Sequence, residues 1–334
     1  MWQKVGEKLN YIIMDLEWNQ CPEGKRKEVK AIPFEIIEIG AVKLNEKLEI
    51  MEEFSEKIKP QVYKKMDQHV GEIIQTTMKD LKNCRKFSLV AEDFLKWCGE
   101  EPVFCTWGTL DLTELQRNMS YYKMAALAKK PFFYYDVQNL FEIFFDEEKA
   151  TRNLAYAVEY FQIEQRGRFH TAINDARYTA LIMQKFDTKK IKKYQAIDYF
   201  HYPKVPEDEV YVSFSSYAKF ISMGYPGKEA LMNAQTVREV KCCVCDKRVA
   251  KKIDWFTNNS KNYYGLFLCK EHGYLKGKVR AKRGLGEEFF AVKTVKIISK
   301  DEAKRLSKQK ARITAKRARK QNNICSDNEQ RNKI

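Results

Sequence analysis

Two acidic residues, Asp15 and Glu17, stand two positions apart at the end of an apolar run that begins at Tyr11. If that run is a β-strand, its period of two places both carboxylates on one face, a few ångströms apart. Carboxylates that close repel each other, and a divalent cation held by their oxygens is the usual way to relieve the repulsion. The pair therefore predicts a metal site at the end of a strand.

Asp111, His170 and Asp175 have the chemistry to join such a site. Asp111 falls in the first turn of a predicted helix, where the helix dipole favours an anion, and it can also serve that dipole alone. Two helical residues five positions apart point about 140° apart. His170 and Asp175 therefore meet only if His170 precedes the helix, on a loop after Gly167. An imidazole with an ordinary pKa near 6.5 suits proton removal from a metal-bound water.

The elements that must hold these residues alternate along residues 1–190. Apolar runs predict strands at Asn10–Leu16, Phe34–Leu44, Glu49–Ile58, Pro102–Thr106 and Phe132–Tyr135. Amphipathic patterns predict helices at Leu89–Cys98, Leu110–Tyr122, Val137–Phe145, Asn153–Tyr160 and Ala172–Lys185. Three strands followed by alternating strands and helices are typical of an α/β domain with a mixed five-stranded sheet flanked by helices.

Three segments of this domain resemble the DEDDh branch of the 3′–5′ exonuclease superfamily, which shares the RNase H-like fold. They are Met14–Asn19 (MDLEWN), Trp107–Asp111 (WGTLD) and His170–Arg177 (HTAINDAR), supported by Phe34–Val42 (FEIIEIGAV). The segments follow in the family's order, and the resemblance covers about residues 8–188. The first two are most similar to the branch of histone-mRNA 3′-end and RNA-interference-associated exonucleases and their bacterial relatives.

The resemblance implies a two-metal hydrolysis of a phosphodiester. It implies that Asp15 ligates both ions and that Glu17 and Asp175 complete the site of the attacking water. Asp111 would support the second ion, and His170 would accept the proton of the water. Two Mg²⁺ or Mn²⁺ ions are expected, because oxygen-rich sites suit them. The expected substrate contacts are Leu16, Trp18, Asn19, Thr77 and Trp107.

Four residues farther along the chain have the spacing of a structural zinc site: Cys242, Cys245, Cys269 and His272. They form C-x₂-C, then 23 residues, then C-x₂-H, and Cys243 is an alternative to Cys242. A full set of four ligands leaves no open position, so this zinc is expected to be structural. The segment between the two pairs predicts a zinc-ribbon hairpin with strands Arg248–Phe256 and Tyr263–Cys269 and a turn at Asn258–Asn259–Ser260.

The net charge of +16 is concentrated in one part of the chain. Residues 1–200 carry 31 Lys/Arg and 31 Asp/Glu, whereas residues 201–334 carry 30 and 14. We predict an exonuclease domain at 1–190, a connector at 191–240, a zinc-ribbon-like module at 241–298 and a basic helical, partly disordered tail at 299–334. Within these parts we expect a short helix at Ser215–Met223, a strand at Phe289–Ile298, a basic helix at Asp301–Lys320 and a frayed end at Gln321–Ile334.

This basic part is expected to hold a polyanion. Residues 241–320 alone carry 24 basic and 7 acidic residues. Aromatic side chains among them can stack on unpaired bases, although at least half are expected to pack the core of the module: Trp255, Phe256, Tyr263, Tyr264 and Phe267.

The sequence therefore predicts an exonuclease that acts on single-stranded RNA or an RNA 3′ overhang. A DNA-directed exonuclease of proofreading or repair is the first alternative, because contacts to the 2′-OH cannot be read from sequence. A nucleic-acid-binding regulator with a silent site is the second, and the intact set of five residues argues against it. No apolar run is long enough for a signal peptide or a membrane span, so we expect a cytoplasmic protein without a membrane partner.

Overall fold

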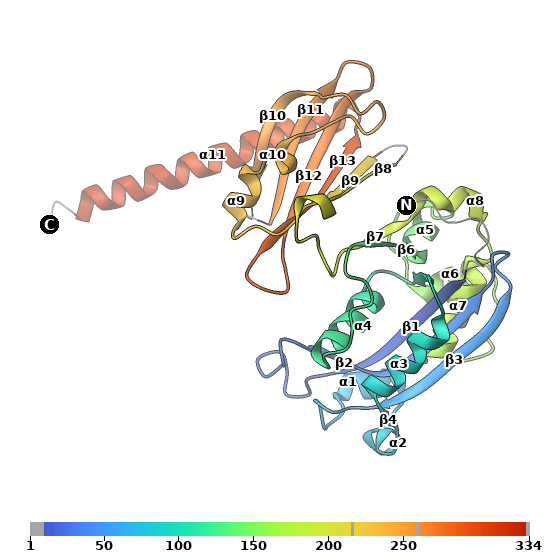
Figure 1. Ribbon diagram of the computed structural model, residues 1–334. Helices are drawn as coiled ribbons and strands as arrows, with labels where there is room; N and C mark the ends of the chain where they lie inside the picture. The colour runs from blue at the N-terminus through green and yellow to red at the C-terminus, as the bar shows by residue number, and fades with distance from the viewer. Residues whose placement is uncertain (1–9, 215–216, 258, 260, 332–334) are drawn as a thin grey trace. The chain divides into compact units, whose positions relative to one another are not determined.

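The computed structural model describes residues 10–214, 217–257, 259 and 261–331, with the backbone alone for 317–331. Contacts divide the chain into two compact units, Met1–Phe200 and His201–Ile334, which we call the N-terminal and C-terminal units (Figure 1). Residues 215–216 of the predicted short helix, and Asn258 and Ser260 of the predicted turn, lie outside the described residues. Within the described part of the chain, no helix is both long and apolar enough to cross a bilayer.

The N-terminal unit contains a seven-stranded mixed sheet in the order β4-β3-β2-β1-β5-β6-β7. Its strands are β1 (Tyr11–Gln20), β2 (Phe34–Leu44), β3 (Ile50–Lys59), β4 (Arg85–Lys86), β5 (Val103–Thr106), β6 (Phe132–Asp136) and β7 (Ala196–Asp198). The central strand β1 pairs antiparallel with β2 and parallel with β5. The predicted mixed α/β fold and its five strands are confirmed. Strands β4 and β7 were not predicted, because two or three residues are too few to show a period.

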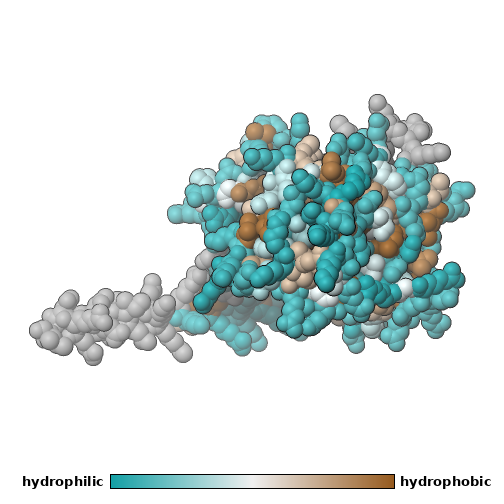
Figure 2. Space-filling model, turned by 90° about the horizontal axis from the view of Figure 1, so that it is seen from below, coloured by the Kyte–Doolittle hydropathy of each residue, from teal (hydrophilic) through white to brown (hydrophobic). Residues whose placement is uncertain are grey.

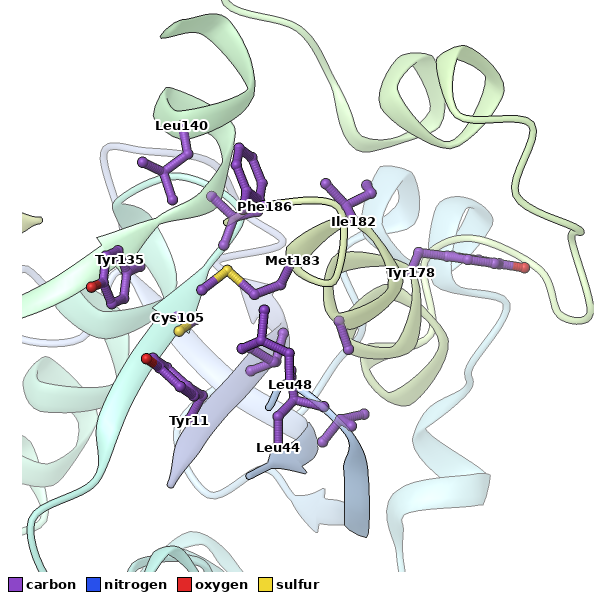
Figure 3. Packing of buried hydrophobic residues seen from close by; sticks show 14 of the residues in the cluster. Tyr11, Leu44, Leu48, Cys105, Tyr135, Leu140, Tyr178, Ile182, Met183 and Phe186 are labelled. Carbon is purple, nitrogen blue, oxygen red and sulfur yellow. The ribbon is translucent and has the colours of Figure 1, made fainter. Parts of the chain in front are cut away.

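Helices cover both faces of this sheet. They are α1 (Gln68–Ile74), α2 (Met78–Leu81), α3 (Phe87–Cys98), α4 (Leu110–Tyr121), α5 (Val137–Phe144), α6 (Leu154–Tyr160), α7 (Ala172–Met183) and α8 (Thr188–Ile191). Successive side chains of β1 point to opposite faces. Ile13 packs in a core with residues of α5, α6 and α7, while Ile12 and Met14 pack in a core with residues of α3 and α4. Figure 3 shows Met183 of the first core reaching toward Cys105 and Phe186.

The C-terminal unit contains a six-stranded antiparallel sheet in the order β10-β11-β12-β13-β9-β8. Its elements are β8 (Val210–Ser213), β9 (Tyr217–Ile221), α9 (Lys228–Asn233), α10 (Gln235–Arg238), β10 (Ala250–Thr257), β11 (Asn262–Cys269), β12 (Gly273–Arg283), β13 (Phe289–Ile297) and α11 (Lys300–Arg331). One face packs on α9, α10 and the cysteine-bearing segment, and the other packs on the first turns of α11.

Two glycines in the middle of this sheet make room for a tryptophan. Gly265 and Gly277 face each other across β11 and β12. A Cβ atom added at Gly277 would lie 2.5 Å from Cη2 of Trp255, and one added at Gly265 would lie 3.4 Å from Cδ2 of the same ring. Trp255 therefore packs against bare backbone, and its Nε1 donates to the carbonyl oxygen of Arg238 at 3.1 Å. Trp255 is half-buried and packs against two cores of this unit, whereas Phe256 and Phe267 are buried.

The structure divides the predicted connector 191–240 between the two units. Strand β7 pairs with β6 in the N-terminal unit, whereas β8, β9, α9 and α10 belong to the C-terminal unit. The predicted helix at Ser215–Met223 is wrong, because Tyr217–Ile221 pairs with β13 as strand β9. Its apolar residues fit both periods, so pairing with a neighbouring strand decides the structure.

The predicted cysteine-bearing hairpin exists as β10 and β11, but β12 and β13 extend it into the larger sheet, so it is not a separate ribbon. Helix α11 runs to Arg331, past the predicted end at Lys320 and into the segment predicted to be frayed. It begins with a capping box, in which the Ser299 N–H donates to Glu302 and the Glu302 N–H donates to the Ser299 hydroxyl.

Large exposed apolar side chains are few and occur in both units, for example Met51, Leu110 and Leu285. The face shown in Figure 2 is mostly hydrophilic, with small apolar patches among polar residues. Charged and polar groups therefore dominate the part of the surface that is seen there.

Candidate active site

A cleft of about 470 Å³ lies beside β1 in the N-terminal unit. Residues from three distant segments and from α5 line it: Asp15, Leu16, Glu17, Trp18, Trp107, Gly108, Thr109, Leu110, Asp111, Gln138, His170 and Asp175. All five predicted catalytic residues are among them, together with the predicted contacts Leu16, Trp18 and Trp107. The folded chain thus brings the three sequence motifs to one place.

Strand β1 presents Asp15 and Glu17 on one face. In the pairing with β2, Asp15 lies opposite Gly40 and Glu17 lies opposite Glu38. The register then shifts, because Trp18 pairs with Ile36 and a residue of β2 is skipped, as in a β-bulge. Two acids from neighbouring strands, Glu17 and Glu38, therefore face each other next to Asp15.

Gly40 allows helix α7 to approach the sheet closely. A Cβ atom at this position would lie 2.1 Å from the backbone carbon of Ala172 and from the nitrogen of Ile173. Burial raises the pKa of the Glu38 carboxyl, and Lys57 and a hydrogen bond accepted from the backbone N–H of Ala172 limit this rise. The Glu-Ile-Gly part of the β2 motif therefore fixes the first turn of α7, from which Asp175 enters the cleft.

His170 precedes α7, as its spacing from Asp175 predicts. Its backbone has a φ of 61°, and its N–H donates to Oδ2 of Asp175 at 3.0 Å. The other oxygen of that carboxylate, Oδ1, is buried and has no hydrogen-bond partner among the described residues. Ligand atoms of Glu17, His170 and Asp175 all lie within 4.8 Å of one another. This grouping can hold a cation.

Asp111 is fixed by two effects. It lies in the first turn of α4, whose dipole favours a negative charge. Its Oδ1 also accepts a hydrogen bond from the backbone N–H of Leu16 at 3.2 Å, which joins the helix to β1. Asp111 is therefore held beside Asp15 and Glu17 by the backbone of their own strand.

Burial raises the pKa of every carboxyl in this set, and repulsion among the acids adds to the effect. The pKa of Glu17 is raised to about 8, first by burial and then by Asp175, Glu38 and Asp111. Burial raises the pKa of Asp111 to about 7 and that of Asp175 to about 6. The pKa of Asp15 is raised well above its ordinary value by burial and by Asp111, Asp175 and Glu17. Divalent cations are the counter-charge that lets such a set ionise at neutral pH.

Two predicted substrate contacts do not line the cleft. Asn19 is fully buried, with Nδ2 donating to the carbonyl oxygen of Lys65 at 2.9 Å and Oδ1 accepting from the N–H of Asp67 at 3.0 Å. It holds the 65–67 segment against the end of β1. Thr77 is exposed and donates to Oδ2 of Asp80 at 2.8 Å, at the start of α2. Both positions fit a structural role better than contact with a ligand in the cleft.

Two lining residues, Leu110 and Gln138, were not predicted as contacts, and the predicted contact Trp107 lies beside them. Gln138 comes from the first turn of α5, and its Nε2 donates to the carbonyl oxygen of Arg152 at 2.7 Å. Leu110, next to Asp111, is 56% exposed. Nε1 of Trp107 is buried without a hydrogen-bond partner among the described residues. These three groups are available to a ligand in the cleft.

The C-terminal unit contains a different grouping of potential metal ligands. Single ligand atoms of its four members lie within 4.8 Å of one another: Cys242, Cys245, Cys269 and His272. Sγ of Cys245 lies 3.8 Å from Sγ of Cys269, and Nδ1 of His272 lies 3.6 and 3.7 Å from the sulfurs of Cys242 and Cys269. Cys243 is buried outside this group, within the sheet core. The backbone N–H of His272 is the main cause that lowers the pKa of Cys269 to about 6.

A mixed sheet with four carboxylates and a histidine in one cleft defines a nuclease of the RNase H-like exonuclease fold. Residues 12–183 match the RNase_T family, described as "Exonuclease", and the chain belongs to this family. The DEDDh resemblance seen in the sequence is thereby confirmed at the level of the family.

The chain is similar to a probable 3′-5′ exonuclease, KapD, of Bacillus subtilis (strain 168). The two are 27% identical over 170 residues, which are 49% of this chain and 78% of KapD. Among solved structures, a 3′-exonuclease that recognises the histone mRNA stem-loop is 20% identical, with a TM-score of 0.46, over 53% of this chain and 81% of that one. The nuclease domain of a DEDDh-family member bound to rAMP is 18% identical, with a TM-score of 0.47, over 58% and 98%.

Proposed function

We propose that this chain is a metal-dependent exonuclease that releases nucleoside monophosphates from the 3′ end of single-stranded RNA. Family membership and the similarity to KapD support 3′–5′ exonuclease activity. The observation that carries the proposal is the cleft, where four carboxylates and one imidazole from three segments meet around an unpartnered buried oxygen of Asp175.

The residues of the cleft fit divalent cations. The carboxylates of Asp15, Glu17, Asp111 and Asp175 would hold Mg²⁺ or Mn²⁺, and such ions polarise a phosphodiester and make a bound water more acidic. Burial of the acids favours this occupancy, because their mutual repulsion is costly without a counter-charge. The oxygen-only set and its open side are typical of these ions.

His170 would supply general base chemistry. Its imidazole lies at the exposed side of the group that it forms with Glu17 and Asp175, within reach of a water at the cleft. Asp175 fixes the backbone of His170 through the 3.0 Å hydrogen bond, so the ring is held at the mouth of the site. A proton taken from the attacking water would pass to the ring and then to solvent.

The walls of the cleft would orient the terminal nucleotide. Trp107 offers an indole N–H without a partner, and Trp18 and Leu110 offer apolar faces for a base or a ribose. The preference for RNA rests on the similarity of residues 14–19 and 107–111 to the branch of exonucleases that acts on histone mRNA and in RNA interference.

The same proposal assigns a structural Zn²⁺ to Cys242, Cys245, Cys269 and His272. Tetrahedral bonds of zinc to sulfur and nitrogen place the ligand atoms roughly 3.5–3.8 Å apart. The observed separations of 3.6, 3.7 and 3.8 Å agree with that geometry. A closed set of four ligands gives zinc a role in folding and none in hydrolysis.

The test is hydrolysis of matched RNA and DNA oligonucleotides labelled at the 5′ end, without added divalent ion and with Mg²⁺ or Mn²⁺. We expect stepwise shortening from the 3′ end, dependent on added metal and faster on RNA. Equal or faster shortening of DNA would replace the RNA assignment with the DNA-directed one. Intact substrate under every condition would leave a binding protein and overturn the exonuclease.

A further inference from the structure

One face of the C-terminal sheet presents a row of cations. Leu275 and Val279 of β12 point into the cores on the side of the cysteine group and α9. Because side chains alternate along a strand, Lys276, Lys278 and Arg280 point to the opposite face. Successive members of this row are two residues apart, which is roughly 6.6–6.8 Å along a strand.

The next strand adds a fourth cation directly across the sheet. Lys296 of β13 is the register partner of Lys276. Like charges opposite each other on neighbouring strands destabilise a sheet. Burial, then Arg280 and Lys276, lower the pKa of Lys278, which shows how closely these charges are packed. We call Lys276, Lys278, Arg280 and Lys296 the basic row.

The basic row has little compensation within the protein. Among the residues that the structure describes, no carboxylate forms an ion pair with any member of the row, although Lys276 lies 5.3 Å over the ring of Tyr264. Glu302 accepts first from the backbone N–H of Ser299, and Lys296 and Lys276 also lower its pKa. Its carboxylate thus caps α11 and lies near the row without pairing with it.

Three other lysines of the same unit form ion pairs with carboxylates. Lys241 pairs with Asp246 at 3.2 Å, and Lys251 pairs with Asp254 at 3.1 Å. Lys247 pairs with Glu271. These three lysines are each compensated by a carboxylate, whereas the four cations of the basic row face one another without one among the described residues.

We propose that the basic row binds the phosphodiester backbone of single-stranded nucleic acid, as a second contact on the strand whose 3′ end enters the cleft. The proposal rests on the proposed exonuclease function. Four unpaired cations at strand spacing complement a regular polyanion, and lysine and arginine contacts to phosphate do not depend on base sequence. The net charge of the unit, 30 basic against 14 acidic residues, adds to the attraction.

Two binding sites on one chain raise the affinity for a strand long enough to reach both, without any change at the site of hydrolysis. The basic row should therefore lower the KM for long substrates and leave a dinucleotide unaffected. This difference separates a role in holding the strand from a role in chemistry.

The test is a triple variant of the full chain, Lys276→Gln, Lys278→Gln and Arg280→Gln. Binding is measured by fluorescence anisotropy with labelled single-stranded RNA and DNA, in an Asp15→Asn background that prevents hydrolysis. We expect Kd to rise on the order of tenfold, and the slope of log affinity against log salt to fall by about 2, because each phosphate contact to a single strand contributes about 0.7. Thermal unfolding should be unchanged or shifted upward, because repulsion within the row is relieved.

The matched control is Lys241→Gln, Lys247→Gln and Lys251→Gln, which removes the same charge from paired lysines of the same unit. Its Kd should change less than that of the first variant. An unchanged Kd in the first variant, or an equal rise in both variants, would overturn the proposal. Tighter binding of duplex than of single strands would overturn the assignment of the ligand.

Hydrolysis of a dinucleotide distinguishes this proposal from the exonuclease itself. With Asp15 intact, the first variant should hydrolyse a dinucleotide at the wild-type rate and a long strand with a raised KM. A wild-type chain that binds strands without hydrolysing them would remove the exonuclease and leave the basic row as a nucleic-acid site. A chain that hydrolyses strands, with no effect of the triple variant on KM, would remove the basic row alone.

Discussion

The two groups of potential metal ligands in this protein differ in how completely they enclose an ion. The cysteine–histidine group of the C-terminal unit brings four ligand atoms within 4.8 Å, and three of its members are connected to the sheet core by burial or backbone contacts. The acidic group of the N-terminal unit lines an open cleft of about 470 Å³ and keeps one buried carboxylate oxygen without a partner.

This difference is what we expect if the first group serves folding and the second serves chemistry. Structural zinc sites fill all coordination positions with protein ligands, whereas catalytic sites leave room for water and substrate. The closed group also ties segments together, because its ligands come from the 242–245 turn and from the end of β11. The open group instead stores electrostatic repulsion among its acids. Loss of a member of the cysteine–histidine group should therefore lower stability. Loss of an acid in the cleft should instead lower the rate of hydrolysis and leave stability unchanged or higher.

The largest expected effect is loss of the closed group in Cys269→Ser. Structural zinc contributes about 10–16 kcal/mol of binding free energy in small zinc domains, so the C-terminal unit should unfold without it. Metal analysis and thermal unfolding measure the result, and Cys243→Ala is the control. That variant removes a neighbouring buried thiol outside the group and should keep its zinc. Zinc lost from Cys243→Ala and kept in Cys269→Ser would reverse the assignment of ligands.

The next effect is on the open group, in Asp15→Asn. Loss of this carboxylate should lower the rate of hydrolysis by roughly 10³-fold or more, since metal-ion stabilisation of the transition state is worth several kcal/mol. Without added Mg²⁺, the unfolding temperature should stay the same or rise, because one repelling charge is gone. Asp93→Asn, which removes an exposed carboxylate of α3, is the control and should leave the rate unchanged. A clear fall in stability for Asp15→Asn would show that the acid supports folding, against the comparison.

A smaller effect is expected from the backbone that positions the acids, in Gly40→Ala. The added methyl group would meet the first turn of α7 at 2.1 Å, and overpacking of this kind costs about 1–3 kcal/mol. The displaced helix carries Asp175, so the rate should fall together with the unfolding temperature. Gly286→Ala, where a Cβ has open space, is the control. A stable Gly40→Ala protein with full activity would show that α7 can move without harm to the site.

The sequence predicted the N-terminal unit and its acids well because the relevant elements are long and periodic. The acids Asp15 and Glu17 alternate on a buried strand, Asp111 lies in the first turn of a helix, and His170 precedes another helix, so the positions follow from local rules. The burial of Asn19 could not be predicted, because only the tertiary fold covers it with the 65–67 segment. Gln138 reaches the cleft from a position that no motif marks, and Leu110 lies within the second motif but was not predicted as a contact.

The C-terminal unit was harder to predict because its strands depend on their neighbours. Strand β12 contains glycine and many lysines, which have low strand propensity, and it is held by pairing with β11 and β13 on its two sides. The grouping of Cys242, Cys245, Cys269 and His272 was predictable from spacing. The choice of Cys242 over its neighbour Cys243 needed the structure, because adjacent residues lie near the same place in a turn and only Cys242 belongs to the group.

The room that Gly265 and Gly277 leave for Trp255 has a consequence for fluorescence. Trp255 is the only tryptophan after residue 200 in the sequence. It packs against the core that contains the cysteine group. Its indole therefore serves as a built-in fluorophore for the C-terminal unit. With the other tryptophans replaced by phenylalanine, its emission would follow the loss of zinc and the unfolding of this unit in real time.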